Sequence, residues 1–329
     1  MAARPQRRER TGHHHCAKHQ SHTPDPGAVC GNDRGIFPAS EVGFLSGYNN
    51  LSKLFRYVNA DGESITFDYG SGYLISKPNG IDSVSVELGT AVGINQAGGI
   101  VQTTHVQERP VTINGIIVGE GQAASKERLL NVIRPDLKGR LYADDYYLDV
   151  YPTETPTVEA GRTGARFQFS LSAAYPYWVQ ENVQVATLIG VAKRFKFPWN
   201  ISRPYRFGEV VQAKFINIRN SGQVAAPYTM TLRALDAVQN PWIDDAKSSK
   251  MLKINKSMIA GEILTVAVTH DQISVTSTVD GDCLGALDIG SDLFELQTGD
   301  NVWKPGADSG LENLQIDVAY AVEKAGVVA

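Results

Sequence analysis

The fold is decided by the stretch Arg109-Pro-Val-Thr-Ile-Asn-Gly-Ile-Ile-Val-Gly119, which lies in the first half of a 329-residue chain. Within it Val111, Ile113 and Ile117 fall on one face of an extended chain. Apolar residues that recur at every second position are typical of a strand with one buried face. The stretch therefore predicts a strand that covers a core.

A helix is predicted directly after this strand, over Gln122–Ile133. The run is rich in good helix formers, and Leu129, Leu130 and Ile133 form the stripe of a helix that lies on a sheet. Pro135 ends the helix, because the residue before a proline is pushed out of the helical region. No other segment of the chain carries a comparable helical pattern.

The residues around this pair carry further strand patterns. They are separated by turn signals such as Asp-Gly and by a Gly-rich loop, Gly89–Gly99. The expected strands are Glu63–Tyr69, Tyr73–Ser76, Ile81–Leu88, Ile100–Glu108, Tyr146–Val150 and Arg166–Leu171. Strands with one covering helix indicate an α+β domain.

From Val210 onward no helix signal occurs, and seven short strand patterns are punctuated by Gly, Asn and Asp. They are Lys214–Arg219, Tyr228–Ala234, Met251–Ile254, Ile263–Thr269, Gln272–Thr278, Leu293–Gln297 and Leu314–Tyr320. This pattern favours a β-sandwich. Before it, Lys193–Asn200 and Arg203–Arg206 mix basic and aromatic residues with prolines, and we interpret them as a strap between domains rather than a nucleic-acid stacking surface.

Composition bounds the class of protein. The length suggests about two domains, and the net charge of −4 argues against a generic nucleic-acid binder. No apolar run approaches the roughly 20 residues that span a bilayer. Three cysteines, Cys16, Cys30 and Cys283, are too few for a disulfide scaffold and fit a reducing compartment.

Residues 1–45 differ from the rest of the chain. The first 34 residues hold six Lys/Arg against three Asp/Glu, together with five of the seven histidines, and show no apolar periodicity. We expect this segment to be disordered. Two interpretations stay open: a non-native leader, or a flexible basic arm. His15, Cys16, His19 and His22 could hold zinc by their spacing, but the second ligand pair of a zinc site is missing apart from Cys30, so no metal site is predicted.

No motif for catalysis or cofactor binding is found. A nucleophile elbow, a phosphate loop and a helical zinc-protease motif are all absent from the sequence. Asp144, Asp145 and Asp149 could pair for glycoside hydrolysis, but three acids at a strand start are more typical of solvated turns. His105 and His270 stand alone in strand-like runs. We therefore predict no enzyme, no cofactor and no catalytic, metal or cofactor-binding residue.

Tryptophans offer an alternative function. Trp242 and Trp303 lie in or beside turn-like segments, where an exposed indole could stack on a sugar ring. The alternative hypothesis is a carbohydrate-binding module that recognises the host cell wall through one of them. A tryptophan is more often a core or interface residue, so ligand-binding residues stay unknown.

These segments together carry a family resemblance. One part resembles the N-terminal domain of the distal tail proteins of phages and prophages of Gram-positive bacteria. It consists of the predicted strand and helix over 109–133 and of two later stretches, Phe167-Gln-Phe-Ser-Leu171 and Ala174-Tyr-Pro-Tyr-Trp178. Four later stretches resemble that family's C-terminal galectin-like sandwich, namely Phe215–Gly222, Asn240–Ile243, Ile259–Glu262 and Phe294–Asn301. The likeness covers about Leu51 to the C-terminus and omits residues 1–45.

The resemblance implies a structural role in the virion. It implies a hexameric ring, formed by the N-terminal domains, that joins the major tail tube protein to a tail-associated or tail fibre protein. It also implies that the C-terminal sandwiches anchor receptor-binding or baseplate proteins. We would then expect a component of the phage tail tip, assembled in the cytoplasm of the bacterial host, that contacts no membrane and no specific nucleic acid.

The sequence thus predicts a mainly β (α+β) protein. We expect a leader over 1–45, an N-terminal β-sandwich-like domain with one α-helix over 46–180, a linker or strap over 181–208, and a galectin-like β-sandwich over 209–329.

Overall fold

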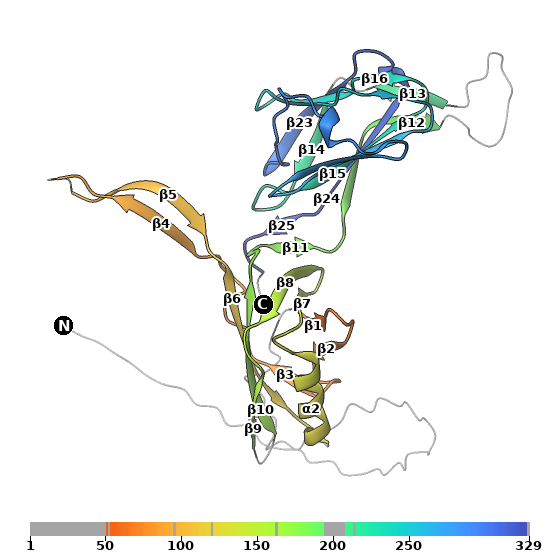
Figure 1. The fold of residues 1–329 in the computed structure, drawn as a ribbon. Coiled ribbons are helices and arrows are strands. Elements are labelled where there is room, and N and C mark those ends of the chain that lie inside the picture. Colours follow the sequence, from red (N-terminus) through yellow and green to blue (C-terminus); the bar gives the residue numbers. More distant parts are fainter. Residues whose placement is uncertain are drawn as a thin grey trace, which may run out of the picture.

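The computed structural model describes residues 51, 53–94, 97–119, 121–161, 164–193, 208–212 and 215–327, without the side chains of 190–193 and 208–212. Two β bodies lie one above the other, and a long two-stranded arm leaves the lower one (Figure 1). No helix in these ranges is long and apolar enough to cross a membrane.

The first body is one antiparallel sheet that folds around a core, in the order β2-β1-β7-β8-β10-β6-β3, with β9 and β11 paired to β10 and β8. Its strands are β1 (Phe55–Asn59), β2 (Ser64–Phe67), β3 (Tyr73–Ile75), β6 (Arg109–Ile117), β7 (Gly139–Ala143), β8 (Tyr146–Pro152), β9 (Thr157–Ala160), β10 (Ala165–Ala173) and β11 (Trp178–Gln180). β6 and β10 pair over nine residues, from Ala165 opposite Ile117 to Ala173 opposite Arg109. The stretch Arg109–Gly119, which predicts a strand that covers a core, therefore contains β6, one strand of the longest strand pairing in this body.

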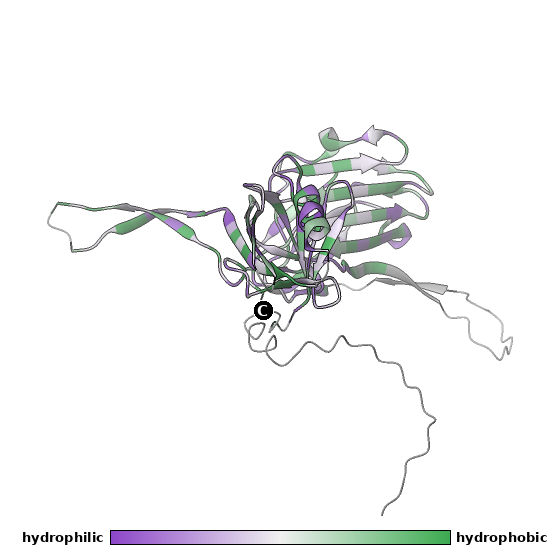
Figure 2. Cartoon of the chain, turned by 90° about the horizontal axis from the view of Figure 1, so that it is seen from below, coloured by the Kyte–Doolittle hydropathy of each residue, from purple (hydrophilic) through white to green (hydrophobic). Residues whose placement is uncertain are grey.

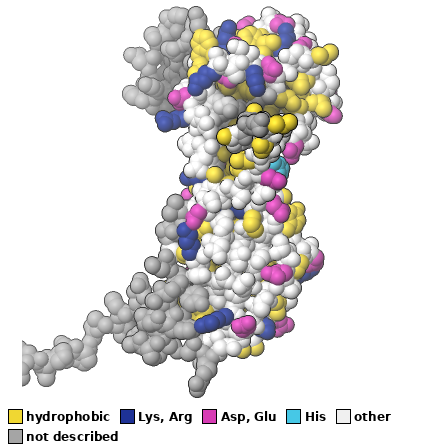
Figure 3. All heavy atoms as spheres, turned by 90° about the vertical axis from the view of Figure 1, so that its left-hand side faces the viewer, with side chains coloured by type: hydrophobic (Ala, Val, Ile, Leu, Met, Phe, Trp, Pro, Cys, Tyr) yellow, Lys and Arg dark blue, Asp and Glu magenta, His cyan; other side chains and the backbone are white. Residues whose placement is uncertain are grey.

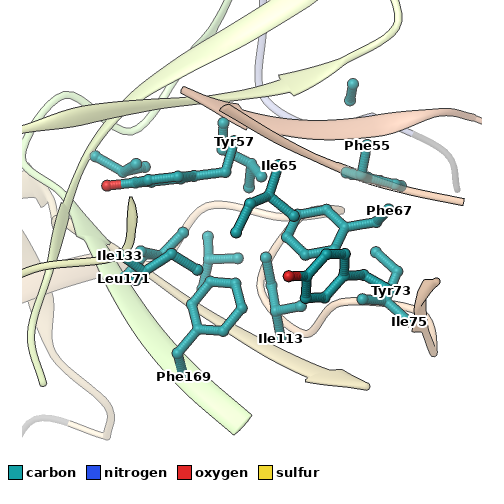
Figure 4. Packing of buried hydrophobic residues seen from close by; sticks show 14 of the residues in the cluster. Phe55, Tyr57, Ile65, Phe67, Tyr73, Ile75, Ile113, Ile133, Phe169 and Leu171 are labelled. Carbon is teal, nitrogen blue, oxygen red and sulfur yellow. The ribbon is translucent and has the colours of Figure 1, made fainter. Parts of the chain in front are cut away.

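Alternating side chains fill the core of the first body. Phe167 and Phe169 of β10 stack on each other with ring centroids 6.1 Å apart, and Phe67 of β2 lies 6.1 Å from Phe169. Ile113 and Leu171 point into the same core (Figure 4). Gly139 leaves room for the ring of Tyr57, since an added Cβ would lie 2.3 Å from its hydroxyl oxygen.

The α-helix of the described chain is α2 (Gln122–Val132), which confirms the predicted helix. Leu129 and Val132 are buried, and Ile133 follows them into the core, whereas Leu130 is half-buried. Gly121 begins the helix with a φ of 78°, a conformation that glycine adopts without strain.

The second body is a sandwich of two antiparallel sheets. The larger has the order β13-β12-β24-β15-β20-β21-β22, and the smaller has the order β14-β23-β17-β18. The larger contains β12 (Gln184–Lys193), β13 (Gly208–Gln212), β15 (Tyr228–Ala234), β20 (Ile263–Val268), β21 (Ile273–Ser277), β22 (Gly281–Asp282) and β24 (Leu314–Tyr320). The smaller contains β14 (Ile216–Asn220), β17 (Trp242–Asp245), β18 (Lys250–Lys253) and β23 (Gly299–Gly306), and β16 (Val238–Gln239) pairs separately with β19 (Ser257–Met258).

Three aromatic rings join the two sheets of the second body. The ring of Trp303 on β23 lies 5.0 Å from that of Tyr228 on β15 and 5.5 Å from that of Phe294, both in edge-on contact. Such packing adds to the burial of apolar area. The mainly β fold class with one helix and a C-terminal sandwich is confirmed.

Some predicted elements differ from the structure. The segment Leu293–Gln297 makes a single bridge, between Ala226 and Leu296, instead of a strand. β23 and β9 lie outside the predicted strands: β23 follows Leu293–Gln297, and β9 lies between Tyr146–Val150 and Arg166–Leu171. Trp303 and Pro305 are buried with Asn301, so tertiary packing outweighs the turn preference of Gly and Asn there.

The connection between the bodies also has more structure than predicted. Gln184–Lys193, part of the predicted strap, is β12 and pairs with β24. The basic-aromatic stretch over 194–207 lies outside the described residues, as does the leader over 1–45. At the other end, β25 (Glu323–Lys324) pairs with β11, and Val327 belongs to the core of the first body. The predicted domain boundaries stay a prediction.

Candidate assembly surfaces

The arm is a hairpin of β4 (Val86–Ala91) and β5 (Ile100–Val106) that extends away from the first body (Figures 1 and 2). Among the described strands, these two pair only with each other. All seven residues of β5 are exposed. An isolated two-stranded hairpin is marginally stable in water at best, and needs a packing partner on one face.

The strand register sorts the arm residues onto two faces. Val86 lies opposite Val106, Leu88 opposite Thr104, and Thr90 opposite Val101, so these pairs share one face. Glu87 opposite His105 lies on the other. A bulge beside Gly89 keeps Val101 on the apolar face, because it adds one residue to β5.

The apolar face of the arm is uncovered. Leu88 is 54 % exposed, Val86 is 50 % exposed, and Ile94 at the tip is almost fully exposed. Figure 3, in which the arm points towards the viewer, shows hydrophobic side chains gathered on it. Contiguous exposed apolar surface on a soluble protein is typical of a protein interaction site.

A second surface is the outer face of β1, β7 and β8. The guanidinium of Arg56 lies 4.5 Å from the ring centre of Tyr142, and that of Arg140 lies 4.5 Å from the ring centre of Tyr147. Asp149 accepts from Arg140 Nε at 2.8 Å. This hydrogen bond to Asp149 raises the pKa of Arg140 above its ordinary value. Arginine and tyrosine are enriched where proteins associate, so this ordered face can serve as a contact surface.

A clamp holds the end of the chain on the first body. The buried Arg109 guanidinium donates to the carbonyl oxygens of Pro176 at 2.7 Å, Gly80 at 2.9 Å and Ile81 at 3.0 Å, and also to that of Ala325. Burial lowers the pKa of Arg109 to about 10, although Asp82 opposes the shift. Four carbonyl groups from three parts of the chain thus share one cation.

The three acidic residues considered for glycoside hydrolysis are structural. Asp144 forms the β7–β8 turn with a φ of 50°, accepts from the Leu54 amide at 2.9 Å, and pairs with Lys53. Asp149 pairs with Lys138 and Arg140. Asp145 is exposed at the same turn. Asp144 and Asp149 are thus each paired with basic groups, and the three aspartates do not form the acid–base pair of a glycoside hydrolase.

The two tryptophans considered for sugar stacking differ in exposure. Trp303 is 1 % exposed and lies in the core of the second body. Trp242 is half-buried, with Lys304 Nζ 5.5 Å from its ring and Gly306 packed against it. The structure therefore contradicts sugar stacking by Trp303.

The two histidines outside the leader have different surroundings. His105 is exposed on the arm. His270 is not solitary, as the sequence suggested, but contacts Tyr175, Glu295 and Glu323. No group of three or more potential metal ligands occurs in the part of the chain that the structure describes, and the His/Cys cluster of the leader lies outside it. The Gly-rich loop that we predicted over Gly89–Gly99 starts inside β4, and its described residues beyond β4 lie at the tip of the arm.

The sequence did not reveal the arm, because apolar and polar residues alternate in its strands as they do in strands with one face on a core. The signal that could have found it is the Gly-rich stretch Gly89–Gly99 between its two strands. Arg109 was quoted only as the first residue of a strand, since sequence alone does not show which carbonyl groups surround a guanidinium.

Comparison with known proteins agrees with this arrangement. Residues 221–321 match the family model of the siphovirus-type tail component, C-terminal domain. The crystal structure of the Dit (gp 19.1) protein of phage SPP1, described as a paradigm of the hub adsorption apparatus in phages that infect Gram-positive bacteria, matches with a TM-score of 0.62 and 14 % identity. The match covers 82 % of this chain and 98 % of that chain.

Two baseplate structures of phage P2 in its activated conformation, with Ca and with Sr, are more distant. Their TM-scores are 0.45 and 0.43, both at 9 % identity. Each match covers 84 % of this chain, together with 100 % of the baseplate chain with Ca and 99 % of the baseplate chain with Sr. No curated protein sequence matches.

The chain has the two-body β fold of a phage distal tail protein. Residues 221–321 of its second body match the C-terminal domain of siphovirus-type tail components. The resemblance predicted from the sequence is thereby confirmed.

Proposed function

We propose that this chain is a structural hub protein of a phage tail, and that six copies close into a ring at the distal end of the tail tube. The shared fold over four-fifths of the chain and the family match of the second body support this proposal. The role needs contact surfaces and no chemistry at a reactive group, so we propose that the protein is not an enzyme.

The observation that carries the proposal is the arm formed by β4 and β5. Its apolar face has no partner among the described residues of the same chain. A neighbouring copy in a ring would cover this face, and each copy would both give and receive one arm. Contacts of this head-to-tail kind close into rings when the rotation between copies allows it.

The remaining partners follow from the same role. We propose that the first body receives the major tail tube protein on one side of the ring and a tail-associated or tail fibre protein on the other. The second body would anchor receptor-binding or baseplate proteins. The protein would then reside in the virion, at the tail tip, after assembly in the bacterial cytoplasm.

The arm gives a direct experiment. Leu88→Asp places a carboxylate on the apolar face, where a covering partner would have to desolvate it. We expect the full wild-type chain to form closed rings in negative-stain images and the variant to stay monomeric, with at least a tenfold rise in the dissociation constant measured by sedimentation.

A matched control adds the same charge elsewhere on the arm. Gln102→Glu lies at the exposed, already polar bulge of β5, so its ring formation should equal that of the wild type. Equal assembly of Leu88→Asp and the wild type would refute the role of the arm.

A further inference from the structure

The two bodies are joined by a narrow two-stranded ribbon. On one side, residues 181–183 link β11 to β12, and on the other, residues 321–322 link β24 to β25. Pairing runs almost continuously along it, since Gln184 lies opposite Tyr320 and Val179 lies opposite Glu323. The Gln180 amide also donates to the Val322 carbonyl at 2.9 Å. A ribbon of this width can bend, so the angle between the bodies depends on contacts beside it.

One such contact is built around His270 in the β20–β21 turn of the second body. Its ring stacks on Tyr175 of the first body, with ring centroids 4.8 Å apart. Its Nδ1 lies 2.6 Å from Glu295 Oε1, and its Nε2 lies 2.5 Å from Tyr175 Oη and 3.4 Å from Glu323 Oε1. Glu323 is 2 % exposed and sits in the ribbon itself.

Hydrogen-bond accounting assigns both ring protons of His270. The carboxylate beside Nδ1 can only accept. The Tyr175 hydroxyl donates its single proton to Glu323 Oε2, so it accepts from Nε2. Both ring nitrogens therefore donate, which only the imidazolium form can do. The neutral ring would leave one of these two contacts without a proton.

The charges around His270 favour the same form. Hydrogen bonding to Glu323 and the negative charges of Glu323 and Glu295 raise the pKa of His270 above its ordinary value, against the effect of burial. Burial and Glu323 likewise raise the pKa of Tyr175, which keeps its hydroxyl protonated. Further ionisable groups near this cluster are Tyr177, Tyr147, Asp271 and Lys250, and Lys324 follows Glu323 on β25.

We propose that His270, Tyr175, Glu295 and Glu323 form a proton-dependent brace that fixes the angle between the two bodies of the chain. Protonated His270 ties the β20–β21 turn to Tyr175 and to the ribbon. When His270 loses this proton, one of its two ring nitrogens can no longer donate a hydrogen bond, to either Glu295 or Tyr175. The angle between the two bodies can then change by bending of the ribbon. This inference concerns a single chain and does not depend on ring formation.

The direction follows from linkage. A histidine whose pKa is raised by docking contributes its full stabilisation below its ordinary pKa of 6.5, and the contribution is lost as the pH rises through the raised value. The brace is therefore closed in mildly acidic solution and open in alkaline solution.

Hydrogen exchange of the full chain, followed by mass spectrometry, tests the brace. After correction for the intrinsic rate, amides of the ribbon and its flanks over 177–183 and 320–326 should exchange about tenfold faster at pH 9 than at pH 6 in the wild type. His270→Gln cannot carry the charge, so its ribbon should exchange at the fast rate at both pH values. Slow exchange of the imidazole C2 hydrogen reports the pKa of His270 in the same sample, and this pKa should lie above the ordinary value of 6.5.

Two variants separate the brace from general destabilisation. Glu295→Gln removes the negative charge beside Nδ1 but keeps an oxygen that can accept from it. It should lower the His270 pKa and reduce the pH step while circular dichroism shows intact folding. Asp271→Asn, on the neighbouring exposed position, should keep the wild-type step. A wild-type ribbon with equal exchange at both pH values, or a His270→Gln chain that keeps the step, would overturn the proposal.

Discussion

Arg109 connects three separate parts of the chain at the first body. Its side chain is 2 % exposed and reaches carbonyl groups between β3 and β4, before β11 and directly after β25. A buried charge is tolerated when hydrogen bonds replace its hydration shell. Sequence placed this residue on a strand but could not show its partners, since they come from positions distant in the chain.

Replacing Arg109 by alanine should destabilise the first body. The change leaves four carbonyl groups without their donor, and each buried unsatisfied group is costly, so we expect a loss of about 3 kcal/mol in the free energy of unfolding. Urea unfolding followed by tyrosine and tryptophan fluorescence measures it. Arg233→Ala, at an exposed position of β15, should change stability by less than about 0.5 kcal/mol.

Glu262 plays a comparable role in the second body. Burial raises the pKa of its carboxyl, but the Ser277 hydroxyl at 2.5 Å, the Ile259 amide at 3.0 Å and Lys256 at 3.2 Å outweigh burial and leave the pKa below its ordinary value. A carboxyl group with a lowered pKa stabilises the folded state at pH values above its ordinary pKa of 4.5. This contribution is lost as the pH falls through the lowered pKa of the folded state.

Glu262→Gln should therefore remove an acid-sensitive part of the stability. At pH 7 we expect a loss of about 2 kcal/mol, because charge-assisted hydrogen bonds are replaced by neutral ones. Below the folded-state pKa the variant and the wild type should converge. Thermal melts from pH 7 to pH 3 measure both effects, and a constant difference over this range would contradict the assignment.

At the scale of elements, α2 shows what periodicity can and cannot predict. The sequence placed Leu129, Leu130 and Ile133 on one stripe. The structure buries Leu129 completely and leaves Leu130 half-buried, because the helix packs its Val132 side against the sheet. The element itself was predictable from local preference, whereas its exact rotation depends on the sheet beneath it.

Alanine substitutions distinguish these two leucines. Leu129→Ala removes a fully buried side chain and should cost about 3 kcal/mol through lost burial and a cavity. Leu130→Ala should cost about 1 kcal/mol, since much of its surface is already in contact with water. Equal losses in urea unfolding would show that both leucines face the core.

Strands were predicted unevenly for a physical reason. β10 and β20 alternate between buried and half-buried or exposed positions over their full length, and their period is visible in the sequence. β23 carries Gly, Asp and Asn at its start, which favour turns locally, yet it pairs with both β14 and β17. The cross-strand contacts that make it a strand come from distant segments, and local preference does not contain them.

At the scale of the molecule, the end of the chain couples the two bodies. After β24 completes the second body, β25 pairs with β11, and Val327 enters the first core, where its amide donates to Ile81 at 3.1 Å. Residues that are distant in the sequence thus share one core. The sequence indicated two domains but gave no signal for this return, because five residues are too few to show a period.

Val327→Asp tests whether this return stabilises the first body. Burial of a carboxylate in an apolar core should destabilise the first body by more than about 3 kcal/mol, with a smaller effect on the second. The same substitution at Val279, which is 55 % exposed on the second body, should change stability by less than about 0.5 kcal/mol. Calorimetry can follow the two transitions, and an unchanged first transition in Val327→Asp would contradict the shared core.

The central claim is that the chain assembles through its arm into a ring, and the mass of the particle tests it most directly. Light scattering of the full chain after size exclusion, with negative-stain images of the same fractions, measures this mass. We predict closed rings of six 35.8 kDa chains for the wild type and for Gln102→Glu, and monomers for Leu88→Asp. A wild-type chain that stays monomeric at every concentration, or a Leu88→Asp chain that forms the same rings, would contradict the account.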